Sequence, residues 1–152
     1  MPNWCYNRIT VYGQNEDSEK KLQEIEETFK KADPFNQIFP IPDFKNIPNE
    51  KGELPKIEQH KNDKGEVVWE TFNFPDGTND DRWYHWCIDN WGTKWDVCDK
   101  SIEMSDYDSL EITFNTAWRP PEGIVERLRE KYPELSFQCF YDEPGMEAAG
   151  YY

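Results

Sequence analysis

Four segments of the chain alternate between apolar and polar residues, as half-buried β-strands do. These segments are residues 4–12, 98–104, 110–118 and 135–141. In the first of them, Cys5, Ile9 and Val11 share one face. A turn-prone stretch, residues 105–109, separates the second segment from the third, so these two are expected to form an antiparallel hairpin.

Two other segments have apolar residues at helical spacing, and each is followed by a proline. The first, residues 17–32, places Leu22 and Ile25 on one face, and the second runs from Pro121 to Pro133. The order is therefore strand, helix, strand, strand, helix, strand. This order predicts an α+β domain with the ferredoxin-like βαββαβ fold, in which two helices cover one face of a four-stranded antiparallel sheet.

Two segments do not belong to this expected core. Residues 34–80 are polar and contain six prolines, so they are expected to form a long insertion after the first helix. Within the insertion, residues 46–65 are expected to be mobile and residues 66–74 to form a short strand or hairpin arm. Residues 82–90 are expected to form a short Trp-rich helix before the second strand. A chain of 152 residues suits one hydrophobic core, so we predict a single domain.

The net charge limits the class of partner. A charge of -14 opposes binding to nucleic acid, because Lys and Arg supply most of the affinity for a phosphate backbone. A basic protein, or a small ligand in a local pocket, is compatible with the charge. No apolar run approaches the roughly 18 residues of a membrane span, and the N-terminus does not resemble a signal peptide. We therefore expect a cytoplasmic protein with no membrane partner.

The sequence has no recognisable metal or catalytic motif. Its cysteines, Cys5, Cys87, Cys98 and Cys139, form no CxxC pair, and only two histidines accompany them, so neither a metal nor a cofactor is expected. His85 and Cys87 are two residues apart and would not face each other on a helix. An enzyme of unknown class is therefore the third hypothesis, behind a protein-binding and a ligand-binding module.

The densest aromatic cluster is WYHWCIDNWGTKWD at residues 83–96. Its rings either fill the core between helix and sheet, or form a stacking pocket for a planar, nucleotide-like ligand. The residues of such a pocket would be Trp91, Thr93, Lys94, Trp95, Asp96 and Arg119. The guanidinium of Arg119 would then clamp an anion. The alternative for Arg119 is an ion pair with Asp96, Asp142 or Glu143.

The face of the expected sheet that points away from the helices is a second candidate surface. Tyr6, Arg8 and Phe140 are expected to lie on it. RNA-recognition domains of this topology bind through the same face. Because the flanking charge is acidic and no RNP-like run is present, nucleic acid is not the expected partner.

Four blocks of the sequence resemble the Api92-like / YubB-like proteins of bacteriophages and plasmids. They are MPNWCYNRITVYG at the N-terminus, WYHWCIDNWGTKWD at 83–96, FNTAWRPP at 114–121 and YDEPGMEAAG at 141–150. The resemblance covers about half of the chain and implies a ferredoxin-like domain, a mobile-element origin in a bacterial host, and no particular activity. Members of this family continue past the last block, so the resemblance implies that this chain is a shorter or a trimmed member.

These observations lead to one main hypothesis and one alternative that ranks ahead of the enzyme. The main hypothesis is a non-catalytic interaction protein of a mobile element that binds a basic protein through its acidic surface. The alternative is a module that binds a small, nucleotide-like ligand through the Trp-rich motif and Arg119.

Overall fold

The computed structural model describes residues 3–105 and 108–152, without the side chain of Ser105. The chain divides into two compact units. The first, which we call the sheet unit, lies within Met1–Pro40 and Cys87–Tyr152. The second, the hairpin unit, is Ile41–Trp86. The interpretation of residues 34–80 as an insertion into a single domain stays a prediction.

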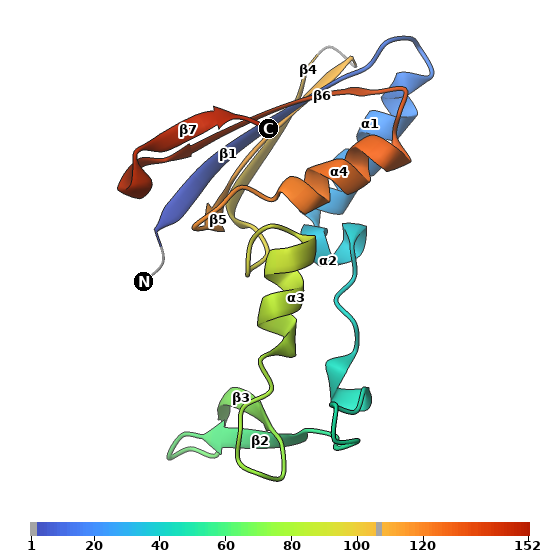
Figure 1. The fold of residues 1–152 in the computed structure, drawn as a ribbon. Coiled ribbons are helices and arrows are strands. Elements are labelled where there is room, and N and C mark those ends of the chain that lie inside the picture. Colours follow the sequence, from blue (N-terminus) through green and yellow to red (C-terminus); the bar gives the residue numbers. More distant parts are fainter. Residues whose placement is uncertain (1–2, 106–107) are drawn as a thin grey trace. The chain divides into compact units, whose positions relative to one another are not determined.

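The sheet unit contains an antiparallel sheet of five strands in the order β4-β5-β1-β6-β7 (Figure 1). The strands are β1 (Trp4–Tyr12), β4 (Cys98–Ser105), β5 (Ser109–Ala117), β6 (Ser136–Glu143) and β7 (Ala148–Tyr151). β1 lies between β5 and β6, with Ile9 opposite both Ile112 and Cys139. The first four strands in this order have the ferredoxin-like arrangement, so the predicted ferredoxin-like α+β fold is confirmed.

The sheet has one strand more than the four that were expected, because β7 pairs with the outer edge of β6. A short 3-10 turn, Pro144–Met146, reverses the chain between these strands. Glu147 completes the reversal with a left-handed backbone, φ 52°. The reversal lets β7 pair with the outer edge of β6, which would otherwise be left with unpaired backbone groups.

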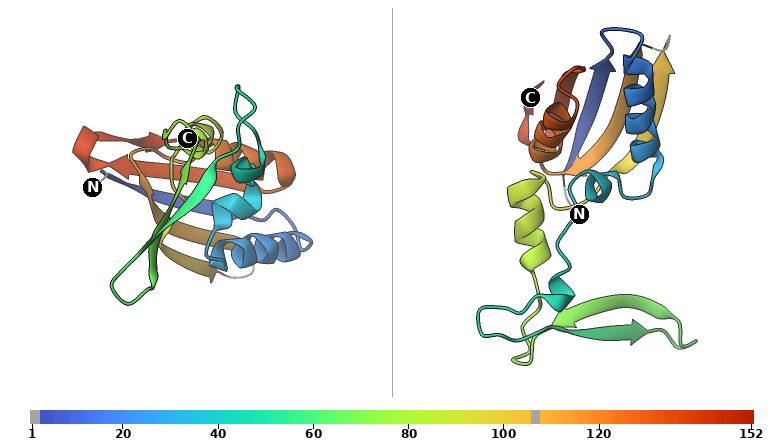
Figure 2. Two further views of the ribbon diagram at one scale, coloured as in Figure 1. Left: turned by 90° about the horizontal axis from the view of Figure 1, so that it is seen from below. Right: turned by 90° about the vertical axis from the view of Figure 1, so that its right-hand side faces the viewer.

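The sheet unit contains one helix beyond those that were expected. α1 (Ser18–Lys30) and α4 (Glu122–Lys131) lie on one face of the sheet, as expected (Figure 2). A further short helix, α2 (Pro34–Ile38), begins at the proline that ends the predicted first helix, because proline is well suited to the first helical position. α3 (Arg82–Asn90) occupies the residues expected for the Trp-rich helix, and the boundary between the two units falls within it.

The core of the sheet unit is built largely from aromatic rings. Phe29 of α1 stacks on Phe114 of β5, with ring centroids 6.1 Å apart. Phe35 of α2 meets the rings of both Phe114 and Trp91 edge-on, at 5.7 Å in each case. All four of these side chains are buried. Helices and sheet are therefore joined by aromatic packing, which suits a chain in which 16% of the residues are aromatic.

The hairpin unit contains a sheet of two antiparallel strands, β2 (Lys56–Lys61) and β3 (Val67–Asn73). β3 falls within residues 66–74, where a strand or hairpin arm was expected. β2 falls within residues 46–65, which were expected to be mobile, and no strand was predicted there. The mostly polar sequence of β2, KIEQHK, has no continuous apolar face and so gave no strand signal. In the described part of the chain, no helix is long and apolar enough to cross a membrane.

Candidate functional site

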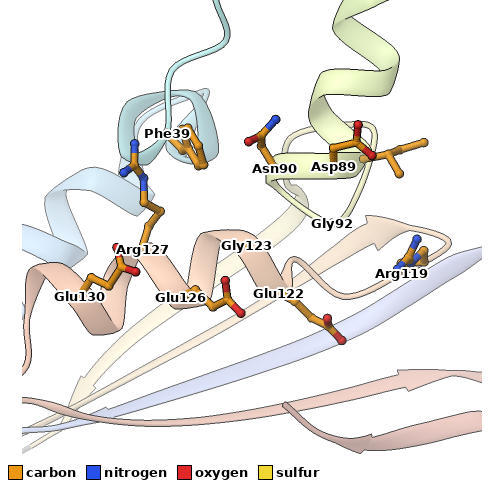
Figure 3. Close-up of a pocket in the computed structure, with 11 residues that line it drawn as sticks. Phe39, Asp89, Asn90, Gly92, Arg119, Glu122, Gly123, Glu126, Arg127 and Glu130 are labelled. Atoms are coloured by element: carbon orange, nitrogen blue, oxygen red, sulfur yellow. The ribbon is translucent and has the colours of Figure 1, made fainter.

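A polar pocket of about 440 Å³ lies between the C-terminal end of α3 and the exposed side of α4 (Figure 3). Carboxylates and guanidinium groups dominate its lining. They belong to Asp89, Glu122, Glu126 and Glu130 and to Arg119 and Arg127. Three of the carboxylates repeat every four residues along the exposed face of α4, and Asp89 and Asn90 lie across from them at the end of α3. We call this cavity the Arg119 pocket.

Two glycines allow the elements around this pocket to approach each other closely. A Cβ atom on Gly123, in the first turn of α4, would lie 1.7 Å from the carbonyl oxygen of Asn90. Instead, the Gly123 N–H donates to the carbonyl oxygen of Trp91 at 3.1 Å. Gly92 has φ +92°, and a Cβ there would lie 3.0 Å from the backbone nitrogen of Glu122. The end of α3 is therefore docked backbone to backbone on the start of α4.

The two arginines of the pocket differ in their surroundings. The guanidinium carbon of Arg127 lies 3.8 Å from the ring centroid of Phe39, in a cation–π arrangement. Arg119 is exposed, and among the described residues its guanidinium has neither a hydrogen bond nor an ion pair. Its expected alternative partner Asp96 binds backbone N–H groups instead. The positive charge of Arg119 is thus available at the wall of the pocket.

Three exposed tryptophans lie where β1 begins and β5 ends. Trp4, Trp95 and Trp118 are 37%, 38% and 41% exposed, and we call them the Trp edge. The rings of Trp4 and Trp95 are 6.3 Å apart, and the ammonium of Lys94 lies 4.3 Å from the centroid of Trp95. Large exposed aromatic side chains grouped in this way are typical of binding surfaces.

Trp118 has a backbone conformation that a bulky residue rarely adopts. Its φ is +68°, in the left-handed region, where a residue of this size is strained by about 1–3 kcal/mol. Its N–H donates to the carbonyl oxygen of Asn3 at 2.8 Å, and the Arg119 N–H donates to that of Ala117 at 2.8 Å. These bonds hold a tight turn that exposes the indole of Trp118 and directs Arg119 into the pocket. Strained residues of this kind cluster at functional sites.

The structure does not bring the six residues of the predicted ligand site into one cavity. Trp91 and Thr93 are buried, and they donate hydrogen bonds to the carbonyl oxygens of Phe39 and Ala117. These two side chains therefore lie in the core of the sheet unit. Lys94 and Trp95 point to the Trp edge, whereas Arg119 lines the pocket. The chain turns at Gly92, so the side chains on either side of the turn point in different directions. Ligand binding by this motif stays a prediction.

The predicted sheet-face residues do lie together. Arg8 is opposite Phe140 in the pairing of β1 with β6, and its guanidinium carbon lies 5.4 Å from the ring centroid of Phe140. Tyr6 is 41% exposed on the same face. Tyr151 of β7 extends this surface, with its ring 5.4 Å from that of Phe140. Whether this face binds a partner stays a prediction.

Asp96 attaches α2 to the rest of the sheet unit and makes a pH-dependent contribution to stability. Its carboxylate accepts hydrogen bonds from the N–H groups of Phe35 at 3.0 Å, Asn36 at 3.1 Å and Val97 at 2.9 Å. Burial nevertheless raises the pKa of Asp96 above its ordinary value of 3.8. The folded chain therefore binds this proton more tightly than the unfolded chain does. This contribution to stability is full below pH 3.8 and is lost as the pH rises through the raised pKa.

We therefore predict that Asp96→Asn, which cannot titrate, gains stability relative to wild type as the pH rises from acid to neutral. Urea unfolding of both proteins across this range measures the difference. Asp33→Asn is the matched control, because hydrogen bonds from Asn36 and Gln37 lower the pKa of Asp33 and its contribution is lost as the pH falls. The control should therefore show the opposite slope. Equal slopes for the two variants would contradict the assignment.

In the described ranges, no group of His, Cys, Asp and Glu side chains is arranged to hold a metal ion. Cys5 and Cys139 are buried free thiols on the helix-covered side of the sheet. Burial raises the pKa of each thiol to about 11, so neither is a ready nucleophile near neutral pH. The chemistry of the site is therefore that of its carboxylates, guanidinium groups and exposed rings.

Comparison with known proteins connects the chain with one group. Residues 90–152 match the family model described as the ferredoxin-like domain in Api92-like protein. The crystal structure of the protein api92 from Yersinia pseudotuberculosis superposes with a TM-score of 0.53. The match covers 99% of this chain and 93% of that chain at 10% sequence identity, which shows similarity of fold alone. None of the curated proteins matches the sequence. The resemblance to Api92-like proteins indicated by the four sequence blocks is thereby confirmed, with residues 90–152 as the part that matches their ferredoxin-like domain.

Proposed function

We propose that this protein is a non-catalytic interaction protein of a bacteriophage or plasmid, and that it binds a basic segment of a partner protein at the Arg119 pocket and the Trp edge. The resemblance of the four sequence blocks supports the mobile-element origin. The observation that carries the binding proposal is the gathering of four carboxylates in one pocket, whose Arg119 directly follows the exposed Trp118 in the sequence.

Carboxylates and aromatic rings together suit Lys and Arg side chains. A cation over an aromatic ring gains about 0.5–2 kcal/mol, and ion pairs with carboxylates add to this. Two cations of the protein itself already lie over rings in this region, Lys94 over Trp95 and Arg127 over Phe39. The net charge of -14 would attract a basic partner over a longer range and speed its association.

The proposal predicts that the pocket carboxylates contribute more to binding than equal charges elsewhere. The variant Glu126→Gln/Glu130→Gln should weaken binding of a short lysine-rich peptide by roughly tenfold, measured by calorimetry at low salt. The matched control is Glu16→Gln/Glu27→Gln, which removes the same charge from exposed positions away from the pocket. The control should bind within about twofold of wild type.

Two further results bear on this test. Trp118→Ala should weaken binding of the same peptide, because it removes an exposed ring without changing the charge. Added salt should also weaken binding, since screening reduces attraction between exposed charges. An equal loss in the pocket variant and its control would mean that only the diffuse charge attracts the peptide, and it would contradict the pocket as the site.

A small ligand in the same pocket is the second candidate, and the free guanidinium of Arg119 is the observation that favours it. Four carboxylates against two arginines make the lining unfavourable for a nucleotide phosphate and more suitable for a ligand with a cationic group. Thermal melts of wild type and Arg119→Ala with a panel of nucleotides decide this point. A nucleotide that stabilises wild type but not the variant would favour the ligand-binding alternative.

A further inference from the structure

We propose that the hairpin unit binds a small, uncharged aromatic compound in an apolar pocket of its own. The pocket has a volume of about 200 Å³, and all of its lining residues belong to Ile41–Trp86. We call this cavity the Phe72 pocket. The inference does not depend on the Arg119 pocket or the Trp edge, which belong to the sheet unit.

Aromatic rings from three different elements form walls of the Phe72 pocket. They belong to Phe44 of the short 3-10 turn Phe44–Asn46, to Phe72 of β3 and to Trp83 of α3. Phe44 and Phe72 are half-buried and Trp83 is 39% exposed, so their rings keep surface that a ligand can contact. Aromatic walls with a few polar groups are typical of small-molecule sites.

A buried ion pair holds these three walls in place. Asp80 lines the pocket and is only 5% exposed, and its carboxylate accepts from Nε and Nη2 of Arg82, both at 2.9 Å. Arg82 Nη2 also donates to the carbonyl oxygen of Phe44 at 2.8 Å, and the Asp80 N–H donates to that of Phe72 at 2.7 Å. Trp83 directly follows Arg82 in the chain. The pocket is therefore preorganised, which lowers the cost of ordering it around a ligand.

This ion pair is difficult to explain by packing alone. All residues of the hairpin unit are described, and among them only Pro55 and Asp80 are buried. Burying a carboxylate costs free energy even when the charge is paired. The guanidinium carbon of Arg82 also lies 5.1 Å and 5.3 Å from the ring centroids of Phe44 and Phe74. The unit thus orders rings around an open pocket instead of closing them into a core, which favours a role in binding.

The size and charge of the Phe72 pocket indicate the class of ligand. Drug-sized ligands occupy pockets of roughly 300–1,000 Å³, so about 200 Å³ suits a compound with a single ring. Two carboxylates line the pocket, but Arg82 neutralises Asp80, and Lys45 balances Asp43. An uncharged ligand therefore fits best.

The polar groups of the lining add one requirement. Lys45 and Trp83 bring an ammonium and an indole N–H to the pocket, and among the described residues neither group has a hydrogen bond or an ion pair. Both are donors. We therefore expect an aromatic ring that carries a hydrogen-bond acceptor, such as an amide carbonyl.

Titration of the full-length chain with benzamide, followed by two-dimensional NMR of the backbone amides, tests the proposal. Benzamide has a planar ring and a carbonyl acceptor, and it should bind with a dissociation constant on the order of 1 mM. The shifted amides should include those of Phe44, Phe72 and Trp83. Cyclohexanecarboxamide is the matched control compound, because it has the same amide group on a non-planar ring. It should bind at least fivefold more weakly, since aromatic walls favour an aromatic ring.

Two variants test the assignment to this pocket. Trp83→Ala should weaken benzamide binding at least fivefold, because it removes one wall. Tyr84→Ala is the matched control, since Tyr84 is the next ring of the same helix but does not line the pocket, and it should bind within about twofold of wild type. The two side chains are 39% and 37% exposed, so both variants should keep their fold, as checked by circular dichroism.

The results that would overturn the proposal are distinct from those that bear on the Arg119 pocket. They are a wild type that does not bind benzamide up to its solubility limit, equal affinity for the two compounds, and an equal loss in the two variants. Tighter binding of N-acetyl-phenylalaninamide than of benzamide would indicate a side chain of a partner protein and would also overturn the small-molecule assignment. The lysine-rich peptide should bind Trp83→Ala as it binds wild type.

Discussion

Replacing Gly123 with alanine is expected to destabilise the protein by about 3 kcal/mol or more, because the new methyl group has no space. Its Cβ would lie 1.7 Å from the carbonyl oxygen of Asn90, which is a backbone atom and not the movable end of a side chain. Either α4 or the end of α3 must shift, and the bond from the Gly123 N–H to the Trp91 carbonyl oxygen would be lost. Urea unfolding of the full chain measures the loss.

The structure and simple helix propensity predict opposite signs for the effect of Gly123→Ala on stability. Glycine is worse than alanine in a helix by about 1 kcal/mol, so the sequence alone would predict that Gly123→Ala stabilises α4. Glu126→Ala is the control in the same helix, because Glu126 is exposed, and its effect should stay within about 0.5 kcal/mol. A neutral or stabilising Gly123→Ala would show that α3 is not docked on α4 as described.

The elements of the ferredoxin-like core could be predicted because the buried residues of each strand alternate with exposed ones, and those of each helix recur at helical spacing. Leu110, Ile112 and Phe114 alternate along β5, and Leu22 and Ile25 follow the helical spacing of α1. β7 could not be found in this way. Its sequence, AAGY, has no alternation and is a strand only because the edge of β6 is available to pair with it. The same is true of β2, whose strand conformation depends on pairing with β3.

The candidate site was predictable only in part, because it depends on tertiary geometry. The sequence indicated Arg119 as an anion clamp and Trp95 as part of the aromatic cluster. No sequence signal placed Trp4 beside Trp95. The exposure of Trp118 follows from its positive φ, which no pattern in the sequence indicates. The carboxylates of Glu122, Glu126 and Glu130 were the missed signal, since their spacing of four residues places them on one helix face.

The exposed site rests on a buried polar network centred on Asn7. Its side-chain N–H group donates to the carbonyl oxygen of Cys5 at 3.0 Å and to Thr116 Oγ1 at 2.9 Å. Its side-chain oxygen accepts from the Tyr152 hydroxyl at 2.9 Å. Thr116 in turn donates to the carbonyl oxygen of Arg119 at 2.7 Å. The network therefore connects the core of the sheet with the turn that carries Trp118 and Arg119.

Asn7→Leu is expected to cost about 3 kcal/mol, because it removes these hydrogen bonds and leaves the Tyr152 hydroxyl buried without its acceptor. Burial and the nearby cysteines already raise the pKa of Tyr152, so this hydroxyl stays protonated and still requires an acceptor. Tyr152→Phe alone should cost about 1 kcal/mol, whereas in the Asn7→Leu background it should cost nothing or restore stability. Unfolding of the four proteins gives the coupling energy, and strictly additive costs would contradict the network. Because Thr116 also fixes the Arg119 carbonyl, Asn7→Leu should weaken peptide binding at the Arg119 pocket, although Asn7 itself is fully buried.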